Sequence, residues 1–182
     1  MRKLAVAACV MALSGIAFAA DAVKSGLPVG ANVPAFNVRD ITGPNKGKTL
    51  CYRCKYGAQP VVTIFTRTMN DGVKELVKSI DEQVAKNQDQ KMAAFVVLLT
   101  ENPDQAEPML EKFASEANIK NTPLTVIEGA AGPPNYKLSK DAEVTVMMWV
   151  ESEVKVNEAF AKGQFDKNHA KKLAGETGKI LQ

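Results

Sequence analysis

Histidine and cysteine are scarce in this chain of 182 residues, which contains the single histidine His169 and the three cysteines Cys9, Cys51 and Cys54. A structural zinc site needs four ligands, almost always cysteine or histidine, and so few of these residues argue against one. The chain also lacks an apolar run of the roughly 20 residues that a membrane-spanning helix requires. We therefore expect no bound metal, no cofactor and no stable insertion into a membrane.

A strong net charge is missing as well. The chain carries 23 Lys and Arg against 20 Asp and Glu, which gives a formal net charge of +3. Loss of Arg2 and Lys3 with a leader would reduce this charge from +3 to +1. Such a balance offers no electrostatic attraction for nucleic acid or for an anionic membrane, so neither is expected as a partner.

The first residues have the pattern of a secretory signal peptide. Two basic residues precede the short apolar stretch 4–16, and Ala17-Phe18-Ala19 fits a cleavage site of the A-x-A type. We predict a signal peptide over residues 1–19. Residues 20–182 then form one exported domain, periplasmic or secreted, of ordinary size.

Hydrophobic patterning predicts a mixed α/β domain. Short runs that are apolar or that alternate with polar residues indicate strands, and apolar positions at a spacing of three and four indicate helices. Strands are expected at 35–41, 61–67, 92–99, 124–127, 144–150 and 154–160, and helices from Asn70 or Asp71 to about Val84, at 102–117 and from Asp166 to about Leu181. Residues 35–54 should form a β-hairpin around a turn-rich stretch. This order combines a parallel core, an antiparallel edge hairpin and helices on both faces of the sheet.

Cys51-Tyr52-Arg53-Cys54 is the only motif with obvious redox chemistry. Removal of Cys9 with the leader leaves just these two cysteines, and in an oxidising compartment their spacing favours a disulfide over a metal site. One interpretation is a redox-active dithiol, with Lys48, Arg53 and Lys55 stabilising a thiolate. One cysteine would attack a substrate disulfide and the other would resolve the mixed disulfide, with Cys51 as the conventional attacker.

Two other interpretations of the pair remain open. No helix start is visible at Cys51, which favours a structural disulfide that fastens a hairpin loop. So short a loop, however, stabilises by only about 2 kcal/mol or less. An open dithiol could also take up a soft metal such as Cu(I), but no histidine or methionine stands near the pair in the sequence.

Three stretches read VGANVPAFNVRD (29–40), GAQPVVTIF (57–65) and YKLSKDAEVTV (136–146). They resemble consecutive motifs of the redoxin (AhpC/TSA-like) branch of the thioredoxin-like superfamily, and the similarity covers about residues 28–180. The resemblance implies a thioredoxin-like three-layer α/β fold. Such a fold has an N-terminal β-hairpin extension and a mixed central sheet flanked by helices.

The usual active-site residues of that family are absent. Its reactive cysteine follows the central strand, where this chain reads Thr66 to Val73 without a cysteine. Its cis-proline aligns near Asp141-Ala142 or, in a competing alignment, with Pro123. The cysteine pair precedes the central strand instead. A strand over 61–67, at about 3.3 Å per residue, therefore places the pair roughly 20 Å from the usual site.

Two functions follow from these observations, and the sequence does not choose between them. One is a thiol–disulfide oxidoreductase that works on a protein dithiol or disulfide through Cys51 and Cys54. The other is a non-catalytic thioredoxin-fold binding protein in which this pair is a structural disulfide. A peroxidase is disfavoured because no cysteine lies where peroxide would be activated. The sequence leaves open whether the chain is an enzyme, which way electrons flow and how it oligomerises.

Overall fold

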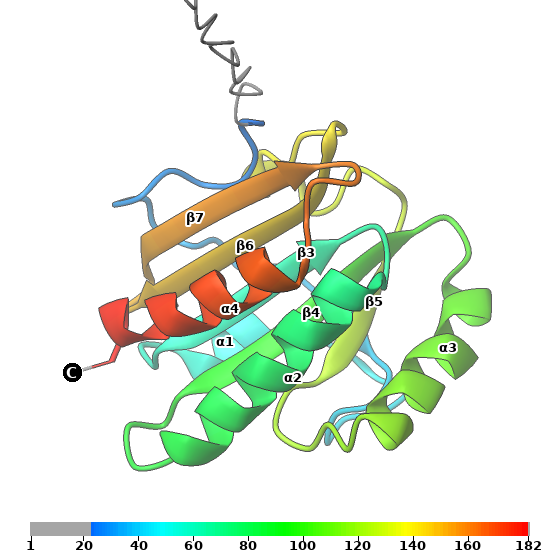
Figure 1. Cartoon of the computed structure of the whole chain (residues 1–182), viewed down its shortest axis with the longest axis horizontal. Coiled ribbons are helices and arrows are strands. Elements are labelled where there is room, and N and C mark those ends of the chain that lie inside the picture. Colours follow the sequence, from blue (N-terminus) through cyan, green and yellow to red (C-terminus); the bar gives the residue numbers. More distant parts are fainter. Residues whose placement is uncertain (1–22, 182) are drawn as a thin grey trace, which may run out of the picture.

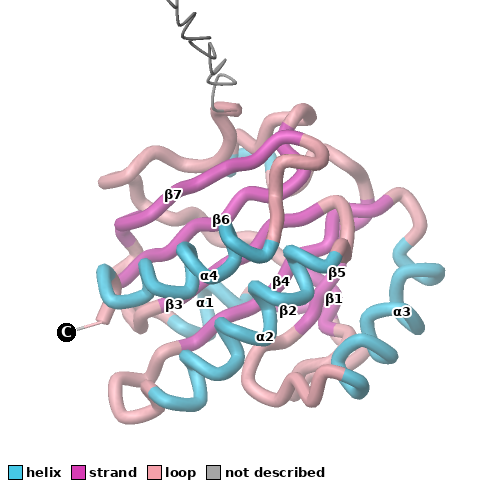
Figure 2. Tube along the Cα trace, viewed as in Figure 1, coloured by secondary structure: helices cyan, strands magenta, loops and turns pink. Residues whose placement is uncertain are grey.

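The computed structural model describes residues 23–181, which fold around a mixed sheet of seven strands in the order β2-β1-β5-β4-β3-β6-β7 (Figures 1 and 2). The strands are β1 (Val38–Asp40), β2 (Thr49–Leu50), β3 (Val61–Thr66), β4 (Ala93–Thr100), β5 (Leu124–Glu128), β6 (Ala142–Val150) and β7 (Glu153–Ala161). β3, β4 and β5 run parallel to one another. The strands on either side, β6 with β7 and β1 with β2, are antiparallel to their neighbours. The expected parallel core with antiparallel edges is confirmed.

The two central strands explain the longest apolar runs of the sequence. All six residues of β3 are buried, and so are the first seven of β4. A strand covered on both faces has no solvent-facing side, so its apolar residues run continuously instead of alternating with polar ones.

Three longer helices cover one face of the sheet. They are α2 (Asp71–Lys86), α3 (Pro103–Glu116) and α4 (Lys167–Gly175), and their buried residues belong to one hydrophobic cluster. The short helix α1 (Tyr52–Tyr56) and the N-terminal segment cover the opposite face (Figure 1). Helices therefore lie on both faces, as expected, but the long ones share a single face.

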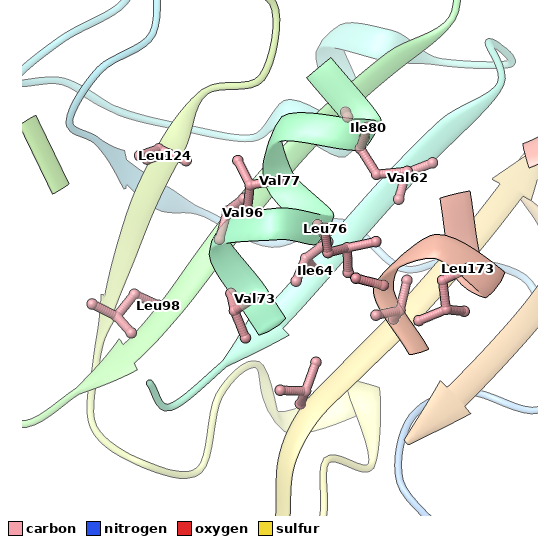
Figure 3. Packing of buried hydrophobic residues seen from close by; sticks show 14 of the residues in the cluster. Val62, Ile64, Val73, Leu76, Val77, Ile80, Val96, Leu98, Leu124 and Leu173 are labelled. Carbon is pink, nitrogen blue, oxygen red and sulfur yellow. The ribbon is translucent and has the colours of Figure 1, made fainter. Parts of the chain in front are cut away.

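Figure 3 shows how α2 packs on the sheet. The side chains Val73, Leu76, Val77 and Ile80 all point towards Val62 and Ile64 of β3 and Val96 of β4, and all of them are fully buried. Spacings of three and four residues place them on one stripe of the helix. The helix begins where the Asn70 side chain accepts the backbone N–H of Val73, as the sequence predicts.

The opposite face of the sheet carries an aromatic cluster. Phe95 of β4 lies within it, and its ring centroid is 5.4 Å from that of Tyr52, 6.0 Å from that of Phe36 and 6.2 Å from that of Trp149. Such ring pairs add to the stabilisation that burial alone provides. The cluster bears on function because Tyr52 belongs to the C-x-x-C motif and so ties that motif to the core.

Two element boundaries differ from the expectations. Only Val38–Asp40 of the expected strand 35–41 forms a strand of the sheet, paired with Thr49 and Leu50 of β2 and with Thr125 and Val126 of β5. The hairpin itself is confirmed, since β1 and β2 pair antiparallel. The last helix ends at Gly175 instead of Leu181 and continues as a 3-10 turn over Glu176–Lys179.

Two expectations concern export and the membrane. The signal peptide expected over residues 1–19 lies outside the described residues and stays a prediction. Within residues 23–181, no helix combines the length and the hydropathy needed to cross a bilayer.

Candidate functional site

Cys51 and Cys54 form a disulfide at the start of α1. Their Cα atoms are 5.2 Å apart, a separation typical of bridged cysteines. Cys51 is the N-cap of the helix, and its Sγ accepts a hydrogen bond from the backbone N–H of Cys54 over 3.0 Å. When the bridge is reduced, the same N–H stabilises negative charge on the Cys51 sulfur.

The expectation that no helix begins at Cys51 is therefore wrong. α1 contains five residues and is capped at its C-terminal end by Gly57, whose positive φ of 57° glycine adopts without strain. So short a helix has no room for a repeating apolar pattern, which is why the sequence did not reveal it. The signals present were a sulfur side chain at the N-cap and a glycine at the C-cap.

The pair lies at the amino end of β3, as expected from its place in the sequence. α1 precedes β3, whereas the helix α2 starts after the carboxyl end of that strand (Figure 1). The amino end of β3, with the cysteine pair, and its carboxyl end, where α2 starts, are thus two poles of the domain separated by the length of this strand. The motif therefore lies at the opposite end of β3 from the position where the redoxin family has its cysteine.

The two cysteines differ in exposure. Cys54 is an exposed residue, and Cys51 is half-buried. Attack on a disulfide depends on access to the sulfur and on how well the other sulfur leaves as a thiolate. Both factors favour attack at Cys54 with departure of Cys51, whose sulfur holds the N-cap hydrogen bond.

The three cations predicted to support the site lie around it without touching the sulfurs. Arg53 donates from Nε to the carbonyl of Val33 over 2.8 Å. The Lys55 ammonium lies 5.7 Å from the centre of the Tyr52 ring, and Lys48 is exposed in the turn before β2. Within residues 23–181 none of the three side chains bonds to either sulfur, and their support of a thiolate stays a prediction.

The buried carboxyl group of Asp40, which the sequence did not reveal, holds the motif in place through Tyr52. Asp40 is fully buried, and its oxygens accept hydrogen bonds from the Tyr52 hydroxyl over 2.7 Å, the Gly43 N–H over 2.7 Å and the Asn45 N–H over 2.8 Å. A Cβ atom at Gly43 would lie 2.5 Å from the Tyr52 hydroxyl, so only glycine fits there. This network fixes α1 on the end of β1.

All three tyrosines of the chain are shielded from ionisation. Burial, reinforced by the hydrogen bond to Asp40, raises the pKa of Tyr52 far above its ordinary value of 10.0. Burial also raises the pKa of Tyr56 and of Tyr136. The Tyr136 hydroxyl donates to the carbonyl of Pro34 over 2.7 Å. These groups therefore hold α1 and its surroundings as neutral hydrogen-bonding or packing residues, not as general bases.

The opposite pole, where the redoxin family has its cysteine, is held by an arginine. The Arg67 guanidinium donates to the carbonyls of Ala142 over 2.9 Å, of Ser139 over 3.0 Å and of Ala130. Burial lowers the pKa of Arg67. Asp141-Ala142, the stretch aligned with the family's cis-proline, leads into β6, the antiparallel neighbour of β3. No peptide bond within residues 23–181 is cis. Among residues 23–181, no cysteine lies at this pole.

His169 lies away from the cysteine pair, on α4. Its ring Nδ1 is 2.7 Å from Asp166, whose carboxylate also accepts the backbone N–H groups of Asn168 and His169. These contacts lower the pKa of Asp166, with the backbone N–H of His169 as the largest cause. Within residues 23–181, no three histidine, cysteine, aspartate or glutamate side chains gather closely enough to hold a metal ion.

Comparison with known proteins identifies the fold. No protein-family model matches the sequence, and no curated protein matches it. A candidate protein disulfide isomerase from Bacteroides thetaiotaomicron is similar in structure, with a TM-score of 0.63 and 16% identity over 87% of this chain and 94% of that one. The fold is thioredoxin-like. A candidate thiol:disulfide interchange protein DsbE from Chlorobium tepidum (TM-score 0.57, 15% identity, 81% and 97% covered) and AhpC from Enterococcus faecalis (0.58, 10%, 82% and 90%) share it.

At these identities the likeness concerns the fold alone. The thioredoxin-like fold and its mixed sheet, expected from the sequence, are confirmed. Arg67 lies at the pole where the redoxin family has its reactive cysteine. Any redox chemistry of this chain therefore depends on its own pair, Cys51 and Cys54.

Proposed function

We propose that this protein is a thiol–disulfide exchange protein that works through Cys51 and Cys54. The observation that carries the proposal is the setting of the pair: one sulfur caps a helix and accepts an N–H, and its bridged partner is exposed. A low-energy thiolate next to an accessible sulfur is what exchange requires.

The exchange proceeds in two displacements. A thiolate of the partner attacks Cys54 Sγ, the Cys51–Cys54 bond breaks, and its electron pair stays on Cys51 Sγ as a thiolate held by the Cys54 N–H. A second thiolate of the partner then attacks the partner's own sulfur in the mixed disulfide and releases Cys54 as a thiolate. The partner leaves as a disulfide, having lost two electrons, and the protein becomes a dithiol once its thiolates take up protons. With a partner disulfide as the substrate, both steps run in reverse.

Accessibility changes the role expected for Cys51. Convention makes the first cysteine of the motif the attacker, whereas the exposure of Cys54 favours this residue as the one that forms the mixed disulfide. Cys51 then acts as the leaving and resolving thiolate. The partner is a protein dithiol or disulfide, and the signal-peptide pattern supports a periplasmic or secreted location for the reaction.

The reduction potential of the pair tests this function. We expect a value between about −120 and −270 mV on equilibration with glutathione or dithiothreitol, the range of known disulfide exchangers. A value below about −300 mV would contradict exchange and leave a structural disulfide. N-terminal sequencing of the protein recovered after export tests the cleavage near Ala19.

A non-catalytic binding protein is the second candidate, and one observation favours it. Tyr52 lies inside the C-x-x-C motif and is also a fully buried member of the aromatic cluster. A structural disulfide at the start of α1 would then stabilise the fold, because it would hold Tyr52 in the aromatic cluster. Loss of global stability on reduction, together with a very low potential, would support this candidate over exchange.

A further inference from the structure

The chain around the disulfide is basic and contains no acidic residue. Between Asp40 and Asp71 the sequence has neither aspartate nor glutamate, although it has five basic residues. Three of them, Lys48, Arg53 and Lys55, lie within the eight residues 48–55 that hold the cysteine pair. The chain as a whole is close to neutral, so this concentration of positive charge is local.

Few of these charges are neutralised by the fold. Lys46 pairs with Glu111, but within residues 23–181 no carboxylate pairs with Lys48, Arg53 or Lys55. Asp40 lies beneath α1, yet it is fully buried and its oxygens are occupied by hydrogen bonds. Lys48 and Lys55 are exposed, so the chain before and after the cysteine pair presents positive charge to an incoming molecule.

A hollow opens beside the same helix. It has a volume of about 430 Å³, and its lining includes Gly43, Pro44, Tyr56, Lys120 and Asn121. Tyr56 is the last residue of α1, so the hollow borders the same short helix that carries the disulfide at its start. The Lys120 side chain is exposed and its ammonium forms no ion pair within residues 23–181, while the buried Asp81 carboxylate accepts the backbone N–H of Lys120. The Lys120 ammonium adds a further positive charge at the hollow. The volume of the hollow is large enough for a side chain of a partner.

We infer that the partner of this disulfide is a protein whose reactive cysteine is flanked by acidic residues, one of which enters the hollow near Lys120. The inference rests on the proposed exchange function. Charge complementarity steers the encounter, and a second negative charge near the attacking thiolate strengthens its attraction to Lys48 and Lys55. A partner with basic flanks would be repelled by the same surface.

Small thiols of different charge test the surface without a protein partner. The oxidised protein is mixed with the anionic 3-mercaptopropionate, the uncharged 2-mercaptoethanol or the cationic cysteamine. The rate constant of each thiol is divided by the rate constant of the same thiol with uncharged 2-hydroxyethyl disulfide, which removes differences in thiol reactivity. At low ionic strength we expect the anionic thiol to be favoured over the cationic one by about tenfold. The preference should shrink on addition of about 1 M salt, because the screening length falls to about 3 Å.

Charge reversal at the site provides the control. The double variant Lys48→Glu/Lys55→Glu should abolish or invert the preference. Lys140→Glu/Lys162→Glu makes the same change in net charge, but these exposed lysines flank the paired ends of β6 and β7 at the other pole and should leave the preference intact. Equal normalised rates for the anionic and cationic thiols in the unmodified protein would overturn the inference, and so would equal effects of the two double variants.

The hollow is tested with two synthetic peptides, each carrying one reduced cysteine, flanked by glutamates in one and by lysines in the other. We expect the acidic peptide to react faster, and Lys120→Gln to slow the acidic peptide by about two- to threefold more than it slows 3-mercaptopropionate. An unchanged rate for the acidic peptide would refute the role of the hollow. Absence of exchange with every thiol would instead refute the proposed function, so the two failures are distinguishable.

Discussion

Replacement of Tyr52 by phenylalanine tests whether the buried network holds the redox motif. The variant keeps the ring, which stacks at 5.4 Å on Phe95 and at 5.3 Å on Tyr56, and removes only the hydroxyl that donates to Asp40 over 2.7 Å. Asp40 is fully buried and keeps only the two backbone N–H donors. The change therefore isolates one hydrogen bond to a buried carboxyl group.

The magnitude follows from that geometry. A hydrogen bond to a charged group contributes about 1.5–3 kcal/mol, and no replacement donor is created by phenylalanine. We expect Tyr52→Phe to lower the free energy of unfolding by about 2 kcal/mol and the melting temperature by about 4–8 °C in a domain of this size. Denaturant unfolding followed by circular dichroism measures the first quantity, and calorimetry measures the second.

Tyr56→Phe is the matched control. Tyr56 belongs to the same helix and the same ring stack, but within residues 23–181 its hydroxyl makes no hydrogen bond. Its loss should change stability by no more than about 0.5 kcal/mol. A double-mutant cycle with Asp40→Asn should give a coupling energy of about 1 kcal/mol or more. If Tyr52→Phe proves as stable as Tyr56→Phe, the argument that Asp40 and Tyr52 anchor α1 is wrong.

Three further predictions concern the cysteines and the titrating groups. At about pH 9.5, where both thiols are largely ionised, Cys51→Ser should react with Ellman's reagent faster than Cys54→Ser, because the remaining Cys54 is the exposed residue. The three tyrosines have pKa values raised by burial, so they should stay neutral in the folded protein well above pH 10, and absorbance at 295 nm should rise only as the protein unfolds. Their stabilisation is complete below the unfolded pKa of about 10 and is lost as the pH rises above it. Asp166→Ala should destabilise the protein at pH 7 by removing the cap of α4, and because the pKa of Asp166 is lowered in the fold, the difference should narrow as the pH falls below about 4.

Each of these outcomes has a clear contrary. Faster labelling of Cys54→Ser would restore Cys51 as the accessible thiol. A smooth tyrosine titration with a midpoint near 10 in a protein that remains folded by circular dichroism would contradict the burial argument. A constant stability difference between the parent and Asp166→Ala from pH 7 to pH 3 would show that ionisation of Asp166 contributes nothing to the cap.

Patterns that repeat along the chain were read correctly from the sequence. The stripe of Val73, Leu76, Val77 and Ile80 predicts α2, and the continuous apolar runs predict β3 and β4. Such patterns arise because a long element must keep one face or both faces out of water, whatever its neighbours are. The position of the cysteine pair before β3, and thus at the pole opposite the family's usual site, also followed from chain order alone.

Elements without a repeating pattern were not predictable in this way. α1 is a five-residue helix, too short to be stable by itself, and it exists because Tyr52 reaches Asp40 and Phe95, residues far away in the sequence. The short extent of β1, Val38–Asp40, likewise follows from which of its residues meet β2 and β5 in the folded sheet. Both are decided by contacts that only the folded chain brings together.

The sequence by itself thus determined the thioredoxin-like arrangement of strands and helices and the presence of one cysteine pair outside the usual site. The tertiary structure alone decided that Cys51 caps a helix, that Cys54 is the more exposed of the two cysteines and that Arg67 occupies the pole where the redoxin family has its reactive cysteine. The physical reason is that amphipathic periodicity is a local property of the chain. Exposure, hydrogen bonding to a sulfur and the charge around it depend on residues that meet only on folding.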